Sequence, residues 1–444
     1  MSCFSRILSD NPEYRNISIS LERNRLPLGV LGLSHIHKAH LIETLSANFN
    51  RKALVLTPDE AQASRLVRDL NAMGANARLY PAKDFAFRPT EGQSREYEHI
   101  RLGVLGSMLD ETAGIVVCSV EAALQLTIPP AVLTANSLRI KTGDSLRPDA
   151  LTDLLLHAGY ARADQVEGLG QFALRGGILD FFPPSSAMPC RIEFWGDTVD
   201  SVFSFDPETQ RSVENTGQTE ITPANEILCG ENESFAALIE EHFLSLKGKG
   251  SAKARTSLMA DVDRLRSGIR LFSFDRYLPL VYPNAASIFD YAGNYLLFVS
   301  ESFAVKERAG ACEKLLHEEI KSYLEEGVLC KGFDHYTLSW AQLTGKYEKA
   351  PTLYLDNLPR GSFDTPVHDL VTMNARQLSP WNGSLLQLID DIGPATALES
   401  QTCVVMSGGE KNAFALSNDL NAEGIRSIFY PSLPESFPKG TVCV

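Results

Sequence analysis

The sequence predicts an α/β protein in which an inserted α+β domain interrupts a parallel-sheet domain, and a linker leads to a small C-terminal α/β domain. Residues 1–125 alternate short apolar runs with amphipathic stretches, which is typical of a parallel sheet covered by helices. Residues 126–220 are rich in turns and short alternating runs, which indicates the inserted α+β domain. Helical patterns over residues 221–346 are expected to complete the first domain, with residues 347–383 as the linker and residues 384–444 as the small domain.

Three apolar runs of the first domain are predicted to be strands of its sheet. They cover residues 26–33, 53–56 and 115–119. The stretch HKAHLIETLSANF, residues 37–49, lies between the first two runs and has a helical pattern. Strand and helix therefore alternate here as in a doubly covered parallel sheet.

A second helix of this domain carries clear signals at both ends. Thr57 is the expected cap, Pro58 stands in the first turn, and Glu60 is the acidic third position of a capping box. Gly74 is the expected stop, because glycine readily adopts the left-handed conformation that ends a helix.

The inserted domain is expected to contain short antiparallel strands with Gly and Asp turns. Its strand candidates are RGGILDFFPP (residues 175–184), RIEFWGD (191–197) and VDSVFSFD (199–206). Beyond it, the apolar run YLLFVS (295–300) predicts another core strand. The expected linker is marked by four prolines, Pro351, Pro359, Pro366 and Pro380.

Two stretches of the chain resemble each other. Residues 69–74 read DLNAMG and residues 419–424 read DLNAEG, and each precedes a strand-like run that ends in Tyr-Pro. Two occurrences are too few for a solenoid, so duplication and independent helix ends of one kind both stay open. The final TVCV is strand-like, and because a domain rarely ends within a strand we expect the sequence to be a fragment.

Composition and charge restrict the class of function. The chain has 444 residues, 44% of them apolar, and no apolar run near the roughly 18 residues that span a membrane. Its eight cysteines are scattered without a C-x-x-C pair, which argues against a zinc site or disulfides. The start lacks a signal-peptide pattern, so we expect a cytoplasmic protein. The net charge of −14 favours a protein partner over DNA.

The segment GLSHIHKAH follows a predicted strand and opens a helix, as a phosphate-binding loop would. Gly32 and Lys38 match the first glycine and the lysine of G-x-x-x-x-G-K-[ST]. His37 replaces the second glycine, where an imidazole would obstruct the amides that surround phosphate. Ala39 replaces the hydroxyl residue that ligates magnesium. We therefore expect a degenerate helicase- or P-loop-like domain that keeps the shape of the site without ATP binding.

A second departure agrees with the first. Ser300 and Glu301 follow the strand YLLFV, at a point where an ATPase of the helicase type has Asp-Glu. The aspartate of such enzymes positions magnesium, and serine cannot replace that carboxylate. The two losses together predict a segment without ATPase activity.

Three nearby histidines raise the question of a metal site. His37 and His40 could share a helix face, but His35 lies at the helix start, and no Asp or Cys completes a ligand set nearby. Capping or solvated histidines are therefore expected, and no metal.

The central motif resembles a known family. The run GLGQFALRGGILDFFPPSSAMPCRIEFWGDTVDSVFSFDPETQR (residues 168–211) is similar to the signature of the domain shared by excinuclease B and bacterial transcription-repair coupling factors. SIFDYAGNYLLFVSES (residues 287–302) resembles the excinuclease B strand that carries its DESH box, here SESF. The resemblance spans about residues 25–345 and is most specific in the central motif.

The departures from excinuclease B favour the N-terminal excinuclease-B-like module of a coupling factor. Excinuclease B has an intact P-loop and a long tyrosine-rich hairpin that clamps damaged DNA, whereas the matching stretch here, residues 80–103, is short and poor in aromatics. The resemblance also implies that the polymerase-binding and motor domains, which use ATP and magnesium, come after Val444.

Alternation along two strands predicts a protein-docking face. In RIEFW the isoleucine and phenylalanine share one face, which leaves Arg191, Glu193 and Trp195 on the other. In QFALR, Arg175 also leaves the apolar face. Two arginines and a tryptophan on adjacent strands have the composition of a binding hot spot. The resemblance implies the same, because in that family the matching arginines, and an aromatic at the position of Trp195, contact the excinuclease A subunit.

A structural alternative stays open for the same residues. Arg175 and Arg191 could form ion pairs with Glu193, Asp180 or Asp206 along the surface of the sheet, which we call a surface ladder. The tryptophan would then cover the sheet edge.

The sequence and the resemblance together predict a monomeric, non-enzymatic adaptor that recruits the excinuclease A subunit to stalled RNA polymerase. It needs no cofactor in this segment, and contacts with polymerase and DNA would belong to downstream domains. The rival is an active excinuclease-B-like, ATP-dependent repair helicase, against which His37, Ala39 and Ser300 stand. A DNA-binding module is a third option, opposed by the charge and the short hairpin region.

Overall fold

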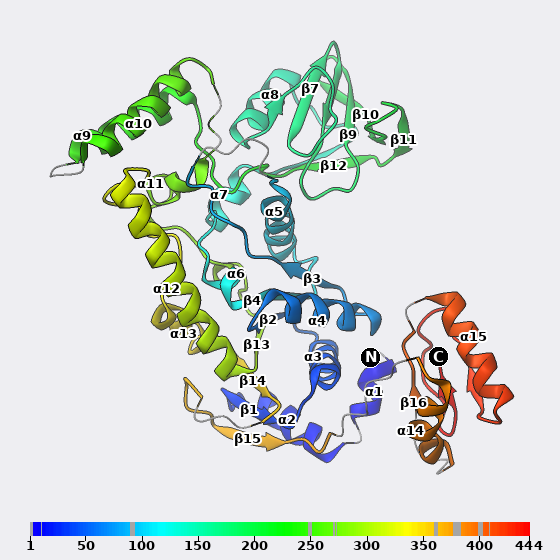
Figure 1. Cartoon of the computed structure of the whole chain (residues 1–444). Coiled ribbons are helices and arrows are strands. Elements are labelled where there is room, and N and C mark those ends of the chain that lie inside the picture. The colour runs from blue at the N-terminus through cyan, green and yellow to red at the C-terminus, as the bar shows by residue number, and fades with distance from the viewer. Residues whose placement is uncertain are drawn as a thin grey trace.

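The computed structural model of the chain describes residues 3–9, 11–88, 94–246, 251–269, 271, 273–358, 363–375, 383–397, 403–407 and 409–444. Figure 1 shows a central sheet domain, an inserted domain beyond one end of it, and a small C-terminal domain beside the N-terminus. The predicted fold class is confirmed: a parallel sheet, a separate antiparallel sheet and a small α/β unit follow one another.

A seven-stranded parallel sheet forms the centre, in the order β15-β1-β14-β13-β2-β4-β3. Five of its strands are buried at every position, as expected when helices cover both faces of a sheet. The strands are β1 (Leu28–Leu31), β2 (Ala53–Thr57), β3 (Ala77–Tyr80), β4 (Ile115–Ser119), β13 (Leu296–Ser300), β14 (Thr352–Asp356) and β15 (Asp369–Thr372).

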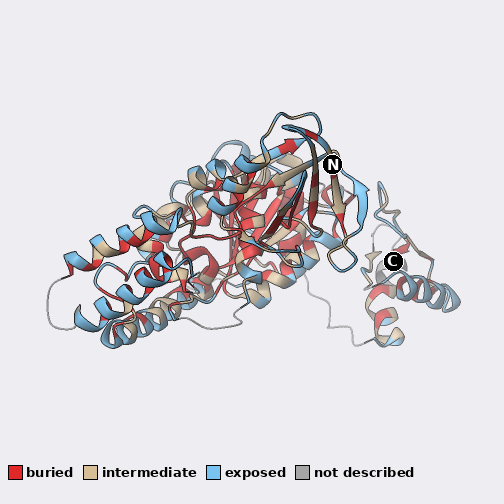
Figure 2. Cartoon of the chain, turned by 90° about the horizontal axis from the view of Figure 1, so that it is seen from above, coloured by how far each residue is buried: buried red, intermediate tan, exposed pale blue. Residues whose placement is uncertain are grey.

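Alternate residues of β2, β4, β13 and β14 enter two separate cores. In β4, Val116 and Cys118 join one core, and Ile115 and Val117 join the other. Figure 2 shows the buried residues inside and the exposed residues on the outer faces of the helices. The second core lies under α1 (Cys3–Ser9), α2 (Pro12–Glu22), α3 (His35–Phe49) and α4 (Glu60–Ala72); the first lies under α5 (Glu96–Leu109), α6 (Val120–Leu124) and the later helices.

Helix α4 begins two residues later than the sequence predicts. Its N-cap is Asp59, whose carboxylate accepts a hydrogen bond from the Gln62 amide at 2.8 Å. Thr57 is instead the last residue of β2, and its hydroxyl donates a hydrogen bond to the Asp59 carbonyl oxygen at 2.9 Å. Aspartate is as good a cap as threonine, so the sequence offers two starts. Gly74 follows the helix with a φ of +84°, in agreement with the prediction.

The expected linker, residues 347–383, is corrected by the structure because it supplies two strands of the sheet. Strand β14 lies between β1 and β13, and β15 lies at the edge beside β1. Pro351 precedes β14, and Pro366 likewise stands ahead of β15 rather than within it. Proline disturbs a strand only where the missing amide would pair, so these positions are compatible with pairing. Pro359 and Pro380 lie outside the described residues.

The inserted domain is built on a six-stranded sheet in the order β11-β10-β9-β8-β7-β6, antiparallel except between β6 and β7. A second, two-stranded sheet pairs β12 with β5. The elements are α7 (Pro130–Ala135), β5 (Leu138–Lys141), α8 (Pro148–His157), β6 (Ala161–Arg162), β7 (Gln171–Arg175), β8 (Ile178–Phe181), β9 (Cys190–Trp195), β10 (Thr198–Phe205), β11 (Ser212–Asn215) and β12 (Gln218–Ile221).

Helices follow the insertion, as the sequence predicts. They are α9 (Asn232–Ser245), α10 (Ser251–Arg266), η1 (Phe274–Tyr277), α11 (Leu278–Val281), η2 (Ile288–Asp290), α12 (Ser302–Glu326) and α13 (Trp340–Tyr347). Within the described ranges, no helix combines the length and the apolar character that a membrane crossing requires.

The C-terminal domain has a three-stranded parallel sheet in the order β16-β18-β17 and two helices. It contacts the first domain through Phe437, whose ring centroid lies 5.2 Å from that of Phe4 in α1. Its elements are α14 (Leu385–Ala397), β16 (Cys403–Val404), α15 (Glu410–Ala422), β17 (Ser427–Ile428) and β18 (Val442–Cys443).

The two similar stretches adopt the same local structure. Asn71, near the end of α4, donates to the Ala77 carbonyl at 3.0 Å and accepts from the Ala77 amide at 2.8 Å. Asn421, near the end of α15, brackets Ser427 in the same way at 3.1 and 2.9 Å. An asparagine near the helix end thus fixes the first residue of the following strand in both domains.

Candidate docking site and degenerate nucleotide site

The loop after β1 uses its backbone amides within the protein. The Gly32 amide donates to the Asn357 carbonyl oxygen at 3.1 Å, and the Leu33 amide donates to the Asp356 carbonyl oxygen at 3.5 Å. The φ of Gly32 is +84°, and the Met373 carbonyl closely approaches the point where a Cβ would lie. The backbone beyond β14 and β15 therefore covers the place where a phosphate-binding loop would expose its amides.

Lys38 is buried and is bonded by the last residue of β13 and by the residue after it. Its ammonium lies 2.5 Å from the Glu301 carboxylate and donates to the Ser300 hydroxyl at 3.1 Å. Only 4% of Lys38 is exposed. Burial lowers the pKa of Lys38, and Glu301 opposes that change. The structure therefore brings together the lysine, the serine and the glutamate that the sequence singled out.

Asp356 is a member of this group that the sequence reasoning missed. Its carboxylate accepts hydrogen bonds from the Ser302 amide at 2.8 Å and the Ser302 hydroxyl at 2.6 Å. Burial raises the pKa of Asp356, and the bonds from Ser302 oppose that rise. The missed signal was an aspartate directly after the apolar run TLYL, which lay in the expected linker.

The histidines of this region have local partners. His37 Nδ1 lies 2.9 Å from the Ser34 hydroxyl, and His40 Nε2 lies 2.8 Å from the Phe4 carbonyl under α1. Ala39 is completely buried. Across the described part of the chain, no group of three or more His, Cys, Asp and Glu side chains is arranged to hold a metal ion.

On the inserted domain, strand register places the predicted docking residues on one face of the sheet. Arg175 pairs with Ile178, and Ile178 pairs with Glu193 across three neighbouring strands. Arg191 and Trp195 lie two residues to either side of Glu193, so they share its face. Their neighbours in sequence point into the domain core. We call Arg175, Ile178, Glu193 and Trp195 the docking face.

Both arginines converge on Asp180, a completely buried carboxylate of β8. Arg191 donates from Nε to one carboxylate oxygen at 2.7 Å and from Nη2 to the other at 2.9 Å. Arg175 donates from Nη2 to the second oxygen, also at 2.9 Å. Both oxygens of a buried charge are thereby satisfied, which such a charge requires.

The two arginines differ in exposure. The Arg191 side chain is 14% exposed, because its guanidinium also donates to the Gln210 carbonyl at 3.1 Å and stacks 4.6 Å over the Phe205 ring. Arg191 therefore lies on the face predicted for docking, but most of its side chain is covered. Arg175, by contrast, keeps 48% of its side chain exposed. Hydrogen bonding to Asp180 raises the pKa of Arg191.

Trp195 is the most prominent apolar group of the docking face. It ends β9 at a hairpin, and 84% of its surface is exposed. Ile178 is 36% exposed between Arg175 and Glu193. Glu193 accepts a hydrogen bond from the Ser201 hydroxyl at 3.0 Å. The face thus combines one accessible guanidinium with exposed apolar surface.

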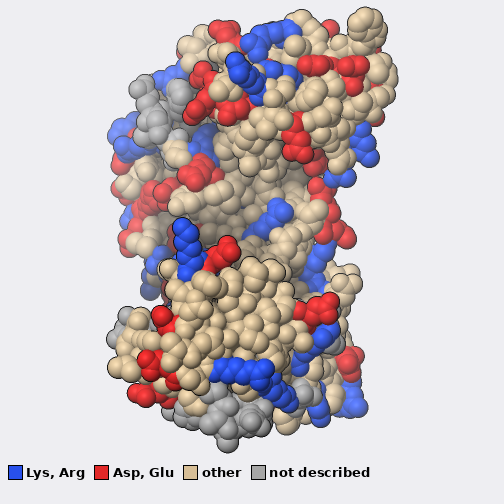
Figure 3. All heavy atoms as spheres, turned by 90° about the vertical axis from the view of Figure 1, so that its right-hand side faces the viewer, with Lys and Arg blue, Asp and Glu red and all other residues tan. Residues whose placement is uncertain are grey.

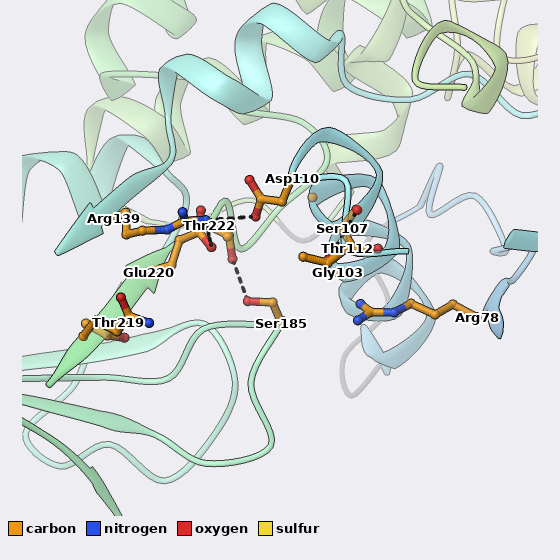
Figure 4. Close-up of a pocket in the computed structure, with 12 residues that line it drawn as sticks. Arg78, Gly103, Ser107, Asp110, Thr112, Arg139, Ser185, Thr219, Glu220 and Thr222 are labelled. Atoms are coloured by element: carbon orange, nitrogen blue, oxygen red, sulfur yellow. Dashed lines mark hydrogen bonds and ion pairs between the residues drawn. The ribbon is translucent and has the colours of Figure 1, made fainter. Parts of the chain in front are cut away.

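A cleft of about 490 Å³, which the sequence did not predict, separates α5 from the inserted domain. Figure 3 shows this side of the molecule hollowed, and Figure 4 shows Arg139 directed at Asp110 and Glu220 across it. The Arg139 guanidinium lies 3.4 and 3.9 Å from these carboxylates. Arg78 also lines the cleft, so its lining holds two arginines and two carboxylates. Because these charges balance, the lining favours neither an anionic nor a cationic ligand.

Comparison with known proteins gives a family for the inserted domain and relatives for most of the chain. Residues 138–227 match the family described as UvrB interaction domain. The transcription-repair-coupling factor of Bacillus subtilis is 27% identical over 395 residues, which cover 87% of this chain and 33% of that protein. The factor of Haemophilus influenzae is 30% identical over 261 residues, which cover 58% of this chain and 22% of that protein. That of Myxococcus xanthus is 28% identical over 277 residues, covering 59% and 22%.

This chain spans about a third or less of the length of these relatives. All residues of the docking face, and Asp180 beneath it, lie within the matched interaction domain. The interaction-domain match, together with relatives that extend along most of the sequence, supports an N-terminal module similar to that of transcription-repair-coupling factors.

Proposed function

We propose that this module is an adaptor of transcription-coupled nucleotide excision repair and that its docking face binds the excinuclease A subunit. The observation that carries the proposal is the exposure of Arg175 and Trp195 on one face of the sheet, within the UvrB interaction domain match. Through this contact, the module recruits excinuclease A to RNA polymerase stalled at a lesion.

The chemistry of the docking face suits a protein partner. A large exposed indole loses water favourably when it enters an apolar socket, and a planar guanidinium engages a carboxylate through two hydrogen bonds. Tryptophan and arginine are the residues most often found at the energetic centre of interfaces. The partner surface should therefore offer an apolar socket next to a carboxylate.

The adaptor is proposed to lack ATPase activity in this segment and to need no cofactor there. Support comes from the amides of the Gly32 loop, which bond to backbone carbonyls, and from Lys38, whose charge is used by Glu301. His37 and Ala39 add the loss of the phosphate-facing glycine and of the magnesium hydroxyl.

The second candidate is an active excinuclease-B-like repair helicase. The cluster of Lys38, Glu301 and Asp356 favours it, because charged groups gather where such an enzyme has its site. The occupied amides weigh against it. Contacts of the whole protein with RNA polymerase and DNA, its cytoplasmic location and its monomeric state belong to the proposal as well.

Direct binding tests the adaptor function. Immobilised excinuclease A is titrated with the purified chain and with the triple variant Arg175→Ala, Arg191→Ala, Trp195→Ala. Each hot-spot truncation typically costs about 2 kcal/mol, or roughly thirtyfold in affinity, so the triple variant should show no saturable binding.

The matched control removes two exposed arginines and one exposed aromatic elsewhere, through Arg23→Ala, Arg68→Ala and Phe414→Ala. It should bind like the parent. A folded triple docking variant that binds as tightly as the parent would remove the docking face from the interaction.

A further inference from the structure

Arg175 of the docking face and its covered neighbour Arg191 are both held by one carboxylate, and their surroundings give them different roles. Asp180 is completely buried and accepts three hydrogen bonds, two from Arg191 and one from Arg175. We infer that Asp180 is a positioning residue of the docking face: it aims the Arg175 guanidinium at the partner and is itself anchored by Arg191. This inference rests on the proposed function.

Arg191 fits the anchor role by its surroundings. Its guanidinium is packed against Phe205 and bonded to the Gln210 carbonyl as well as to Asp180. These contacts engage Nε and both terminal nitrogens, so few donors are left for another molecule. Arg191 therefore neutralises and orients the Asp180 carboxylate rather than meeting the partner directly.

Arg175 fits the contact role. It gives Asp180 one hydrogen bond, from Nη2, and keeps about half of its side chain exposed. Arg175 is the last residue of β7, and the next residue, Gly176, has a φ of +60° and begins the turn into β8. The guanidinium is therefore fixed at one edge while the rest of the planar fork faces solvent. A fork held in this way loses little rotamer freedom on binding a carboxylate.

The charges agree with this division of tasks. Asp180 with its two arginines carries one net positive charge, and the exposed share of that charge lies on Arg175. The partner group selected by this arrangement is a carboxylate beside an apolar socket for Trp195. Without the Asp180 charge, Arg175 would sample several rotamers, and the partner would bind only the fraction that is correctly aimed.

A double-mutant cycle on excinuclease A binding tests the inference with four proteins: the parent, Asp180→Asn, Arg175→Ala and the double variant. We expect Arg175→Ala to weaken binding by roughly thirtyfold and Asp180→Asn by about tenfold. The double variant should be scarcely weaker than Arg175→Ala, a coupling of about fivefold or more. Asp200→Asn, which neutralises an exposed carboxylate of β10, is the control and should bind like the parent.

Three results are distinguishable. If the parent binds and the two losses simply multiply, Asp180 has no positioning role and the proposed function stands. If Asp180→Asn binds like the parent, the inference is also overturned. If the parent does not bind excinuclease A at all, the proposed function fails and the docking role of Asp180 fails with it.

A measurement on the parent protein covers the case in which Asp180→Asn does not fold. Nitrogen-15 spectra of selectively labelled arginine report rotation of each guanidinium about its Nε–Cζ bond. Arg175 should rotate slowly and show separate Nη signals, in contrast to the exposed Arg68. Averaged signals for Arg175, like those of Arg68, would mean that Asp180 does not hold it.

Discussion

Arg101 Nε lies 2.5 Å from a Glu226 carboxylate oxygen, and both side chains are completely buried. Arg101 belongs to α5 of the first domain, whereas Glu226 lies at the end of the matched interaction domain. The Lys83 ammonium is 2.9 Å from the other Glu226 oxygen, and the Arg101 guanidinium stacks 4.3 Å over the Tyr80 ring. This ion pair fixes the point where the chain leaves the inserted domain.

Glu226→Gln should destabilise the protein by about 3 kcal/mol or more near neutral pH, because it leaves Arg101 as an uncompensated buried charge. Lys83 would lose one of its two carboxylate partners and keep the other, Asp275. Burial by itself would raise the pKa of Glu226, but Arg101 and Lys83 hold that pKa below its ordinary value of 4.5. The stabilisation is therefore present above about pH 4.5 and is lost as pH falls through the lower folded value.

Urea denaturation of the parent and of Glu226→Gln at pH steps from neutral to acid measures this difference. It should be largest near neutral pH and shrink in acid. Glu325→Gln, which changes an exposed glutamate, is the control and should match the parent at every pH. A Glu226→Gln protein as stable as the parent near neutral pH would show that the ion pair contributes nothing.

Restoring the missing side chains of the nucleotide site should not restore ATP binding. In the variant His37→Gly, Ala39→Thr, Ser300→Asp, the Gly32 amide still bonds to Asn357. Phosphate would have to displace that bond and the Met373 carbonyl beside Gly32. Titration calorimetry with ATP and magnesium should give no heat for parent or variant, with an intact P-loop ATPase as the positive control. A low-micromolar dissociation constant for the parent would end the assignment of a dead site.

The sheet was largely predictable because its strands are short apolar runs. The predicted strand at residues 115–119 coincides with β4, and the run at 53–56 lies within β2. Periodicity reports burial, and the central strands of a parallel sheet are buried on both faces. The edge strand β15 was not visible in the sequence, because it has only four residues and none of them is buried.

Other features depend on contacts between residues distant in sequence. Asp356 joins the group around Lys38 only because β14 inserts between β1 and β13. The alternating pattern of β9 placed Arg191 on the correct face of the sheet. It could not show that Phe205 and Gln210 contact the Arg191 guanidinium and cover it. Sequence patterns therefore located the candidate site, whereas the geometry distinguishes its exposed members from its buried ones.

The module should bind DNA weakly at physiological salt and without preference for damaged duplex. Where excinuclease B has its long hairpin, two aromatics of this chain pack against each other: Phe87 is 1% exposed, and its ring centroid lies 5.5 Å from that of Phe85. Tyr97 is the exposed aromatic of the described part of this stretch. The net charge of −14 also opposes binding to a phosphate backbone. Fluorescence anisotropy with matched intact and lesion-bearing duplexes measures this, and a clear preference for the lesion would favour the helicase alternative.

The shared asparagine bracket should contribute to the stability of each domain. Asn71→Ala leaves the Ala77 amide and carbonyl without their side-chain partner, and Asn421→Ala does the same at Ser427. Each loss should cost about 1–3 kcal/mol of unfolding free energy. Asp at either position keeps the acceptor and loses the donor, so it should lie between Asn and Ala. Equal stability of all three side chains in denaturant titration would make the bracket incidental.

Lysine substitutions should distinguish the role of Arg175, in the docking face, from that of Arg191, which anchors Asp180. Arg175→Lys keeps the charge but not the planar fork, so it should weaken excinuclease A binding with little change in stability. Arg191→Lys cannot reproduce the paired bonds to Asp180 together with the bond to Gln210, so it should lower stability as well as affinity. It should lose much of the affinity that Arg191→Ala loses.

Thermal unfolding and excinuclease A titration of the same protein preparations give both quantities for each variant. The contrast depends on exposure, because Arg175 is 48% exposed and Arg191 is 14% exposed above a buried carboxylate. Removing a partner from a buried charge costs stability, whereas trimming an exposed fork costs mainly binding. If Arg175→Lys destabilises the fold as much as Arg191→Lys does, both arginines are structural, and the surface-ladder interpretation of these strands would hold.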